Sequence, residues 1–285
     1  MVLARTGALV AEAHAAGRCC PAFNVVQLEH ATAIVAAAEE LDQPLLLQVS
    51  HNAVRYHGAL EPLGAAMLET ARNARTPVGV HLDHAESVDL VRTAVSLGFS
   101  SVMFDASALE HDDNVRRTAR VVRDCHDSGV WVEAELGRIG GKDGVHAPGA
   151  RTDPDEAVQY VRETGVDALA VAVGTSHAML TRDADLDFAL IRRLRAALDV
   201  PLVLHGSSGV ADEDLREAVR AGLTKINIAT RLNQEFTAAV RKSLADEPNG
   251  VDPRRYLGAA RAATVRETTR LLAALDPTAT TPATP

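Results

Sequence analysis

Cysteine is scarce in this chain of 285 residues, which contains only Cys19, Cys20 and Cys125. Adjacent cysteines are poor partners for each other, and an odd number leaves one thiol unpaired in any case. The sequence therefore lacks the disulfide framework on which many small secreted proteins depend. We expect a protein of the reducing cytoplasm.

Long hydrophobic runs and an excess of positive charge are also missing. No stretch approaches the roughly 18 uncharged apolar residues of a membrane helix. Residues 1–18 carry Glu12 and are typical of an amphipathic helix, not of a signal peptide. The formal net charge is −9, whereas nucleic-acid binding needs clustered lysine and arginine. We expect neither a membrane nor a nucleic-acid partner.

What the chain does contain is a repeated alternation of apolar runs and helical segments. Several runs are almost continuously apolar, as in strands that are buried on both faces of a parallel sheet. Segments with helical spacing lie between them, for example 30–41 and 211–222. The apolar runs are 19–26, 44–50, 78–84, 100–106, 131–137, 168–174, 201–208 and 225–230.

Eight strands alternating with helices predict an α/β protein of the (β/α)8 TIM-barrel class, and the length suits one. A doubly wound open sheet is the alternative, but it usually has fewer strands, and no GxGxxG follows the first run. We expect one catalytic domain over 1–275, with an extra C-terminal helix at 252–275 and a disordered tail at 276–285. The long segment 137–154 is rich in glycine and charge, as functional lids or disordered loops are.

Polar side chains mark the ends of the predicted strands. The carboxyl ends of barrel strands meet at one mouth, where barrel enzymes build their active sites. Buried charges are costly unless they are paired or bound to metal, so a ring of such groups is poor core material. The residues are Asn24, Gln48, Ser50, Asp83, His84, Asp105, Glu133, Glu135, His177, His205 and Asn227.

Three of these residues are histidines, namely His84, His177 and His205. Neutral imidazoles are the usual zinc ligands, and three protein ligands with one open position is the catalytic arrangement. A single histidine at a strand end is more often a hydrogen-bonded structural residue. The shared position of the three at one mouth favours a metal site.

Five other histidines receive ordinary interpretations. His81 lies on the same strand as Asp83, and we expect it to be structural. The rest are predicted to be solvated helix or loop positions: His14, His30, His111 and His126.

Asp83 directly precedes His84. An acid beside a metal site is placed to move a proton on the substrate, whereas the structural alternative is an N-cap for the next helix. The run HGSSG at 205–209 resembles a backbone amide cradle for phosphate at a helix start, with a plain tight turn as its alternative. The run NIAT at 227–230 could present a helix N-terminus to an anion in the same way.

Taken in chain order, eight segments resemble the class II, metal-dependent fructose-bisphosphate aldolase family, and most closely its tagatose-bisphosphate aldolase branch. The ordered set spans about residues 1–275. The segments are PAFN (21–24), HLDH (81–84), VEAELG (132–137), GG (140–141), AVAVGTSH (170–177), LVLHGSSG (202–209), TKINIAT (224–230) and DPRRY (252–256).

The resemblance implies a reversible cleavage of fructose or tagatose 1,6-bisphosphate to dihydroxyacetone phosphate and glyceraldehyde 3-phosphate, through a zinc-stabilised enediolate. Asp83 would exchange the proton of the hydroxyl formed from the aldehyde carbonyl, and Asn227 would contact the enediolate. The one catalytic zinc per chain would be held by His84, His177 and His205, with Asp105 and Glu135 as secondary metal positions.

The resemblance also implies where the substrate binds. Asn24 and Ser50 match positions near the aldehyde half, and Arg254 matches an arginine that a neighbouring subunit supplies to the distal phosphate. The protein would then be a homo-oligomer, a dimer or a tetramer. A monovalent cation is often found beside the ketose phosphate in this family, and the positions around that phosphate are Gly174, Gly206, Ser208 and Thr230.

The chain departs from the family in its long loop, where GGKDG offers Asp143 in place of the glutamate that exchanges the carbon-bound proton. Because misplacement by about 1 Å can cost roughly a hundredfold in rate, slow turnover or another substrate is an expected consequence. HGSSG has a serine where the fructose-bisphosphate branch has a second glycine, and Ala229 stands where that branch has an acid. Both changes favour the tagatose or related branches over the glycolytic enzymes.

Lysine is as scarce as cysteine, with only Lys142, Lys225 and Lys242. The carbanion left by carbon–carbon cleavage needs either a lysine Schiff base or a metal as its electron sink. Lys225 begins the eighth strand, at the wrong end for Schiff-base chemistry, which favours metal.

Three alternatives stay open at this point. One is an aldolase for another phosphorylated keto sugar. The second is a non-catalytic sugar-phosphate-binding subunit, because members of the tagatose branch can depend on an accessory partner subunit. The third, a metal-dependent hydrolase, commonly begins with an HxH pair on the first strand, which the first strand here lacks.

Overall fold

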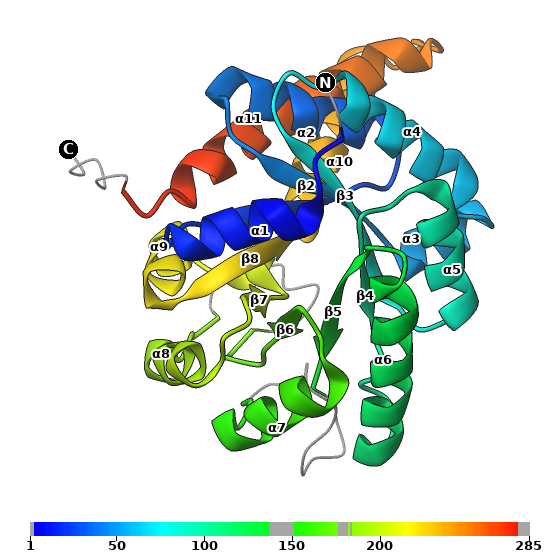
Figure 1. Ribbon diagram of the computed structural model, residues 1–285. Coiled ribbons are helices and arrows are strands. Elements are labelled where there is room, and N and C mark those ends of the chain that lie inside the picture. The colour runs from blue at the N-terminus through cyan, green and yellow to red at the C-terminus, as the bar shows by residue number, and fades with distance from the viewer. Residues whose placement is uncertain (1–2, 137–150, 176–181, 183, 279–285) are drawn as a thin grey trace.

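The computed structural model describes residues 3–136, 151–175, 182 and 184–278. Within them, eight parallel strands close into a barrel in chain order, each hydrogen-bonded to the next and β8 to β1 (Figure 1). The (β/α)8 prediction is confirmed, and the open sheet is wrong. The strands are β1 Cys20–Asn24, β2 Leu45–Ser50, β3 Val78–Ala85, β4 Ser101–Phe104, β5 Trp131–Glu135, β6 Ala168–Ala170, β7 Leu202–Leu204 and β8 Leu223–Ile228.

Helices surround the barrel, and their apolar faces pack against the outer faces of the strands (Figure 1). Each strand is followed by at least one helix, as the alternation in the sequence predicts. These helices are α2 Leu28–Leu41, α3 His51–His57, α4 Glu61–Asn73, α5 Val88–Leu97, α6 His111–His126, α7 Pro154–Thr164, α8 Phe188–Ala197, α9 Asp212–Ala221 and α10 Thr230–Asp246.

Two further helices lie outside the repeating unit. The predicted C-terminal helix is α11 Pro253–Ala274, which Asp252 caps by accepting a hydrogen bond from the backbone of Arg254, and it packs on α2 and α10. The other is α1 Thr6–Ala15, which crosses the amino-terminal end of the barrel (Figure 1). A Cβ on Gly79 of β3 would come within 2.8 Å of Thr6 Oγ1. Because α1 packs this closely on the strands, the opposite end is the open one.

Strands β6 and β7 are shorter than the apolar runs that predict them. The run 168–174 becomes a strand only to Ala170, and the run 201–208 becomes one only over Leu202–Leu204. The remaining residues turn into the mouth of the barrel, where Gly174 and Gly206 have positive φ angles of 121° and 69°. An apolar run indicates which residues are buried, and here the buried residues extend beyond the strands into the loops that follow them.

His30 is buried, although the sequence predicts a solvated helix position for it. Its side chain is only 2% exposed and stacks on Phe236 of α10, with ring centroids 4.7 Å apart. The expectation of a solvated helix position is wrong because α11 packs on α2 and Phe236 of α10 covers the ring. Burial lowers the pKa of His30 to about 4, so the ring is neutral.

No helix in the described part of the chain is both long enough and apolar enough to cross a membrane.

Candidate active site

A cavity of about 180 Å³ opens at the carboxyl ends of the strands. The residues around it come from strands at both ends of the sequence, and Ser50 of β2 pairs in register with Asp83 of β3. Five of the predicted polar strand ends therefore meet at this cavity: Asn24, Ser50, Asp83, His84 and Asn227. The cavity is lined by Asn24, Ser50, Asn52, Asp83, His84, Gly206, Ser207, Ser208, Asn227, Ala229 and Thr230.

Asp83 and His84 both reach this cavity, although neighbouring residues of a regular strand point to opposite faces. The pairing of β3 with β4 shifts register between Leu82 and Ala85, and His84 has a φ of +52°. A left-handed conformation is costly for a non-glycine residue, by roughly 1–3 kcal/mol, and tends to persist at functional sites. The irregularity turns the two side chains toward one mouth.

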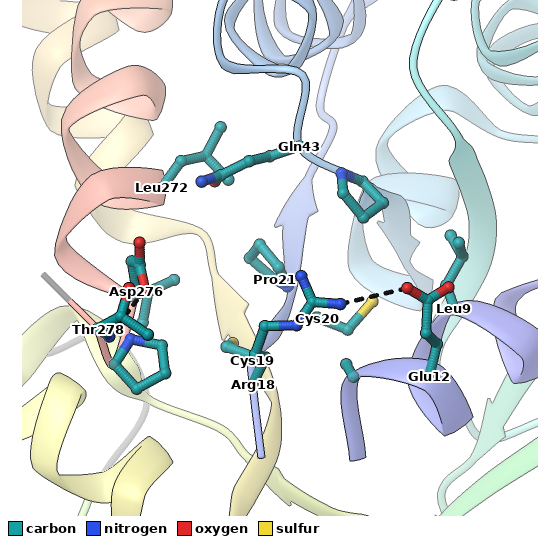
Figure 2. A pocket seen from close by; sticks show the side chains of 14 residues that line it. Leu9, Glu12, Arg18, Cys19, Cys20, Pro21, Gln43, Leu272, Asp276 and Thr278 are labelled. Atoms are coloured by element: carbon teal, nitrogen blue, oxygen red, sulfur yellow. Dashed lines mark hydrogen bonds and ion pairs between the residues drawn. The ribbon is translucent and has the colours of Figure 1, made fainter. Parts of the chain in front are cut away.

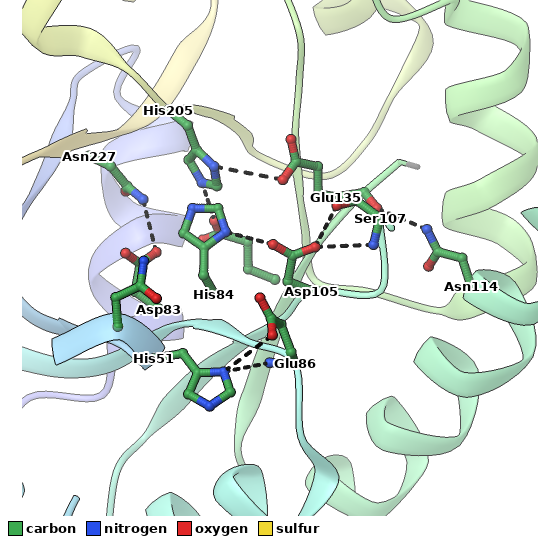
Figure 3. Close-up of polar contacts among 12 residues, drawn as sticks. His51, Asp83, His84, Glu86, Asp105, Ser107, Asn114, Glu135, His205 and Asn227 are labelled. Carbon is green, nitrogen blue, oxygen red and sulfur yellow. Dashed lines mark hydrogen bonds and ion pairs between the residues drawn. The ribbon is translucent and has the colours of Figure 1, made fainter. Parts of the chain in front are cut away.

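His84 and His205 lie edge to face, with ring centroids 4.6 Å apart (Figure 3). His84 Nδ1 donates to Asp105 Oδ2 at 2.8 Å, and His205 Nε2 donates to Glu133 Oε1 at 3.1 Å. A carboxylate on one ring nitrogen sets the tautomer and makes the other nitrogen the one that can bind metal.

Two groups of side chains in the described residues could hold a metal ion. In one group, ligand atoms of Asp83, His84 and His205 lie within 4.8 Å of one another, and in the other the same holds for His84, Asp105 and Glu135. A set of imidazole nitrogens and carboxylate oxygens suits a zinc ion. The predicted third ligand, His177, lies outside the described residues.

The charged form of His84 and the charged forms of Asp83 and Asp105 stabilise each other. Burial alone would lower the pKa of His84, but the neighbouring carboxylates, Asp83 first and then Asp105 and Glu135, raise it to about 10. Burial alone would raise the pKa of Asp83, yet His84, Lys225 and the other cationic neighbours hold it below its ordinary value. Burial alone would also raise the pKa of Asp105, but its hydrogen bond with His84 lowers it.

Asp83 is 3% exposed and is held by two amides. Asn24 Nδ2 donates to its Oδ2 at 3.1 Å, and Asn227 Nδ2 donates to its Oδ1 at 3.2 Å (Figure 3). The structural alternative for Asp83 is wrong, because the cap of α5 is Ser87, whose hydroxyl accepts from the backbone of Leu90. Asp83 is thus a fixed carboxylate that faces the cavity.

The family is decided by a match over nearly the whole chain. The family model described as class II fructose-bisphosphate aldolase matches residues 4–278. The chain belongs to the class II fructose-bisphosphate aldolase family. It is therefore an enzyme, an aldehyde-lyase that makes or breaks a carbon–carbon bond, and the class to which it belongs is zinc-dependent.

Solved structures agree with this assignment. The chain is 32% identical to the YdjI aldolase of Escherichia coli K12, with a TM-score of 0.86 over 96% of this chain and 97% of that one. It is 30% identical to a fructose-1,6-bisphosphate aldolase, described as putative, from Coccidioides immitis, with a TM-score of 0.84 over 96% of both chains. A fructose-bisphosphate aldolase from Campylobacter jejuni, 22% identical, shares the fold with a TM-score of 0.76 over 94% of this chain and 93% of that one.

The candidate phosphate run of this aldolase forms a short 3-10 turn, Ser207–Gly209, after Gly206. Ser207 Oγ donates to the backbone oxygen of Asn227 at 2.5 Å, and Ser208 Oγ accepts from the backbone N–H of Arg231 at 3.3 Å. The first residue of α10, Thr230, lines the same cavity. The positive end of the α10 dipole therefore lies at this cavity, beside the 3-10 turn.

Gly174 lies in the neighbouring loop, where only glycine fits. A Cβ on it would come within 2.0 Å of the backbone oxygen of Asp185. The nearby Thr175 hydroxyl donates to the backbone oxygen of His205 at 2.6 Å. The loop is thus fastened to the segment that carries a candidate metal ligand.

Five of the predicted site residues that the structure describes do not line this cavity: Asp105, Glu135, Gly174, His205 and Arg254. Arg254 does not line it: its side chain is 88% exposed and pairs with Asp252, with Nη2 and Oδ2 2.7 Å apart. Asp143 lies outside the described residues, so its predicted role is a proposal only.

Lys225, which the sequence analysis placed at the wrong end of the strand, reaches the site from within the barrel. Its Nζ donates to Asn227 Oδ1 at 2.7 Å and lies 2.8 Å from Glu133 Oε2. The signal that could have found it is the spacing of two residues from Asn227, because alternate residues of a strand share a face. A buried ammonium that is paired with a carboxylate remains a poor Schiff-base nucleophile.

A second pocket, of about 220 Å³, lies beside α1 and α11 at the start of β1 (Figure 2). Glu12 and Arg18 form an ion pair of 3.2 Å there, beside Cys19 and Cys20. Burial raises the pKa of Cys20 to about 12, so this thiol is not a ready nucleophile. None of the groups of side chains in the described residues that could hold a metal ion belongs to this pocket.

Proposed function

We propose that this aldolase reversibly cleaves a ketose 1,6-bisphosphate to dihydroxyacetone phosphate and glyceraldehyde 3-phosphate. The observation that carries the proposal is the position of Asp83. This carboxylate is fixed by Asn24 and Asn227 beside two imidazoles, in a cavity that also contains the candidate phosphate cradle. A proton-transfer group, a metal group and an anion site are the three parts that such a cleavage needs.

The metal in this proposal is one catalytic zinc ion per chain, held by His84, His205 and His177. Asp105 and Glu135 would offer it a secondary position. When bound, zinc supplies the electrophile that stabilises the charge left when a bond beta to a carbonyl breaks. The hydrogen bonds from His84 to Asp105 and from His205 to Glu133 support the assignment, because they orient both rings.

Three side chains of the protein transfer protons or bind the substrate. Asp83 exchanges the proton of the hydroxyl formed from the aldehyde carbonyl, and its lowered pKa keeps the carboxylate ionised before the transfer. Asn227 donates a hydrogen bond to the reacting ketose half. Asp143 takes the role of the absent loop glutamate in moving the carbon-bound proton.

The two ends of the substrate bind separately. Asn24 and Ser50 contact the aldehyde half, and Arg254 from a neighbouring subunit binds the distal phosphate, which makes the enzyme a homo-oligomer. A monovalent cation beside the first phosphate completes that site. The groups that surround this first phosphate are Gly174, Gly206, Ser208 and Thr230.

The tagatose epimer is the substrate we favour, because HGSSG and Ala229 depart from the glycolytic pattern. The test is the release of dihydroxyacetone phosphate from fructose and tagatose 1,6-bisphosphates by metal-quantified protein, with and without a chelator. We expect release that the chelator abolishes and zinc restores, faster from the tagatose epimer.

The other outcomes separate the alternatives. No release in spite of one bound metal per chain would point to another phosphorylated keto sugar or to a missing accessory subunit. No release and no bound metal would point to a non-catalytic sugar-phosphate-binding subunit. Release that survives the chelator would contradict the metal mechanism itself.

A further inference from the structure

Lys225 is a fully buried cation at the centre of the barrel, with 0% of its side chain exposed. Its ammonium touches two groups, Asn227 Oδ1 at 2.7 Å and Glu133 Oε2 at 2.8 Å. Burying a lysine is costly unless its charge is paired, and Glu133, itself 0% exposed, supplies that charge. Charge pairing accounts for the contact of Lys225 with Glu133, but it does not require the contact with Asn227.

The contact with Asn227 decides which way its amide faces. An ammonium has three donors and no acceptor, so Asn227 must present its oxygen to Lys225. The amide nitrogen then points the other way, and Nδ2 donates to Asp83 Oδ1 at 3.2 Å. Without Lys225 the amide oxygen loses its donor, and of these two contacts only the one with Asp83 is left to hold the amide.

We propose that Lys225 is a positioning residue for the aldolase reaction, which holds the Asn227 amide so that its N–H groups face Asp83 and the substrate. This inference rests on the proposed function for its kinetic consequence. Lys225 itself does not line the cavity, so it acts through Asn227. The same cation holds Glu133, whose other oxygen accepts from His205 Nε2.

The test removes the lysine without leaving a buried charge behind. Lys225→Met alone would strand Glu133, so it is combined with Glu133→Gln as a charge-neutral pair. The pair is made in the wild-type enzyme and again in an Asn227→Ala background, and each protein is assayed at matched metal content. The control is Lys242→Met, at an exposed lysine of α10 that pairs with Asp246, and it should leave kcat unchanged within about twofold.

In the wild-type background we expect the neutral pair to lower kcat about 10–100-fold, the range of groups that orient a site residue, with a smaller change in KM. In the Asn227→Ala background the same pair should cost less than about threefold, because its target is already gone. Equal costs in both backgrounds, or no cost in either, would overturn the inference.

A crystal structure of the neutral pair, at a resolution that separates the amide nitrogen from the oxygen, tests the same inference without activity. We expect an Asn227 amide that is rotated away from its wild-type position or adopts more than one conformation, and an unchanged one would overturn the inference. A wild-type enzyme that cleaves neither bisphosphate would contradict the proposed function but leave this structural result standing.

Discussion

Asn227 and Asp83 are separated by 144 positions in the sequence, yet the amide of one donates to the carboxylate of the other at 3.2 Å. Asn24 donates to the second oxygen of the same carboxylate, and Gln48 Nε2 in turn donates to Asn24 Oδ1 at 2.7 Å. A carboxylate that accepts N–H groups on both oxygens is stabilised in its charged form. These contacts set the carboxylate plane as well as its charge.

The first prediction concerns proton transfer. Asp83→Asn keeps the shape of the side chain but removes the base, so kcat should fall by about 10²–10⁴, the usual contribution of general acid–base catalysis. Metal content should stay at the wild-type level. Steady-state assays with metal analysis of the same preparation check both statements, and near-normal turnover would refute the role of Asp83.

The second prediction concerns the metal. His205→Ala should lose tightly bound zinc and cleavage activity together, while circular dichroism shows a folded barrel, because His205 follows the end of β7 and is not part of the strand. His126→Ala is the matched control, since His126 is on the outer helix α6 and pairs with Asp167, away from the cavity. Wild-type zinc content in His205→Ala would show that this residue is not a ligand.

The third prediction is a loss of stability in mild acid caused by His30. Its pKa in the folded state is about 4, below the ordinary value of about 6.5, so between these values the unfolded chain binds the extra proton. The free energy of unfolding therefore falls as the pH is lowered from about 6.5 to 4, by up to about 3 kcal/mol from this group.

Urea unfolding at pH 7 and at pH 4.5 measures this effect. His30→Leu keeps an apolar side chain against Phe236 and removes the titrating ring, so it should lose less stability on acidification than the wild type. An equal loss in both proteins would mean that other groups cause the acid sensitivity.

The fourth prediction concerns the loop that follows β6. At Gly174 an added Cβ meets the backbone oxygen of Asp185 at 2.0 Å, and the φ of +121° is itself unfavourable for other residues. Gly174→Ala must displace the loop, and we expect KM for the bisphosphate to rise at least tenfold.

Gly58→Ala is the control that introduces the strain of a positive φ without a steric clash. Gly58 also has a positive φ, of +79°, but nothing lies within 4 Å of its added Cβ. This variant should lose about 1 kcal/mol of stability and keep its KM. If the two variants had the same KM, close packing at Gly174 would not matter for substrate binding.

The sequence alone determined the barrel and the position of its site. Continuous apolar runs that alternate with helical segments fit a parallel barrel, and parallel strands bring the polar residues at their carboxyl ends to one mouth. Asp83, His84, His205 and Asn227 could therefore be singled out before any coordinates, because the argument needs only the order of residues along each strand.

Only the tertiary structure decided how those side chains face one another. The register shift and positive φ that bring Asp83 and His84 to the same cavity arise from the pairing of β3 with β4. Lys225 joins the site because Glu133 lies across the barrel from it, and His30 is neutral because α10 covers it. Periodicity within one segment reports which residues share a face or are buried but not which distant segment they meet, so the partners of these residues had no signal in the local sequence.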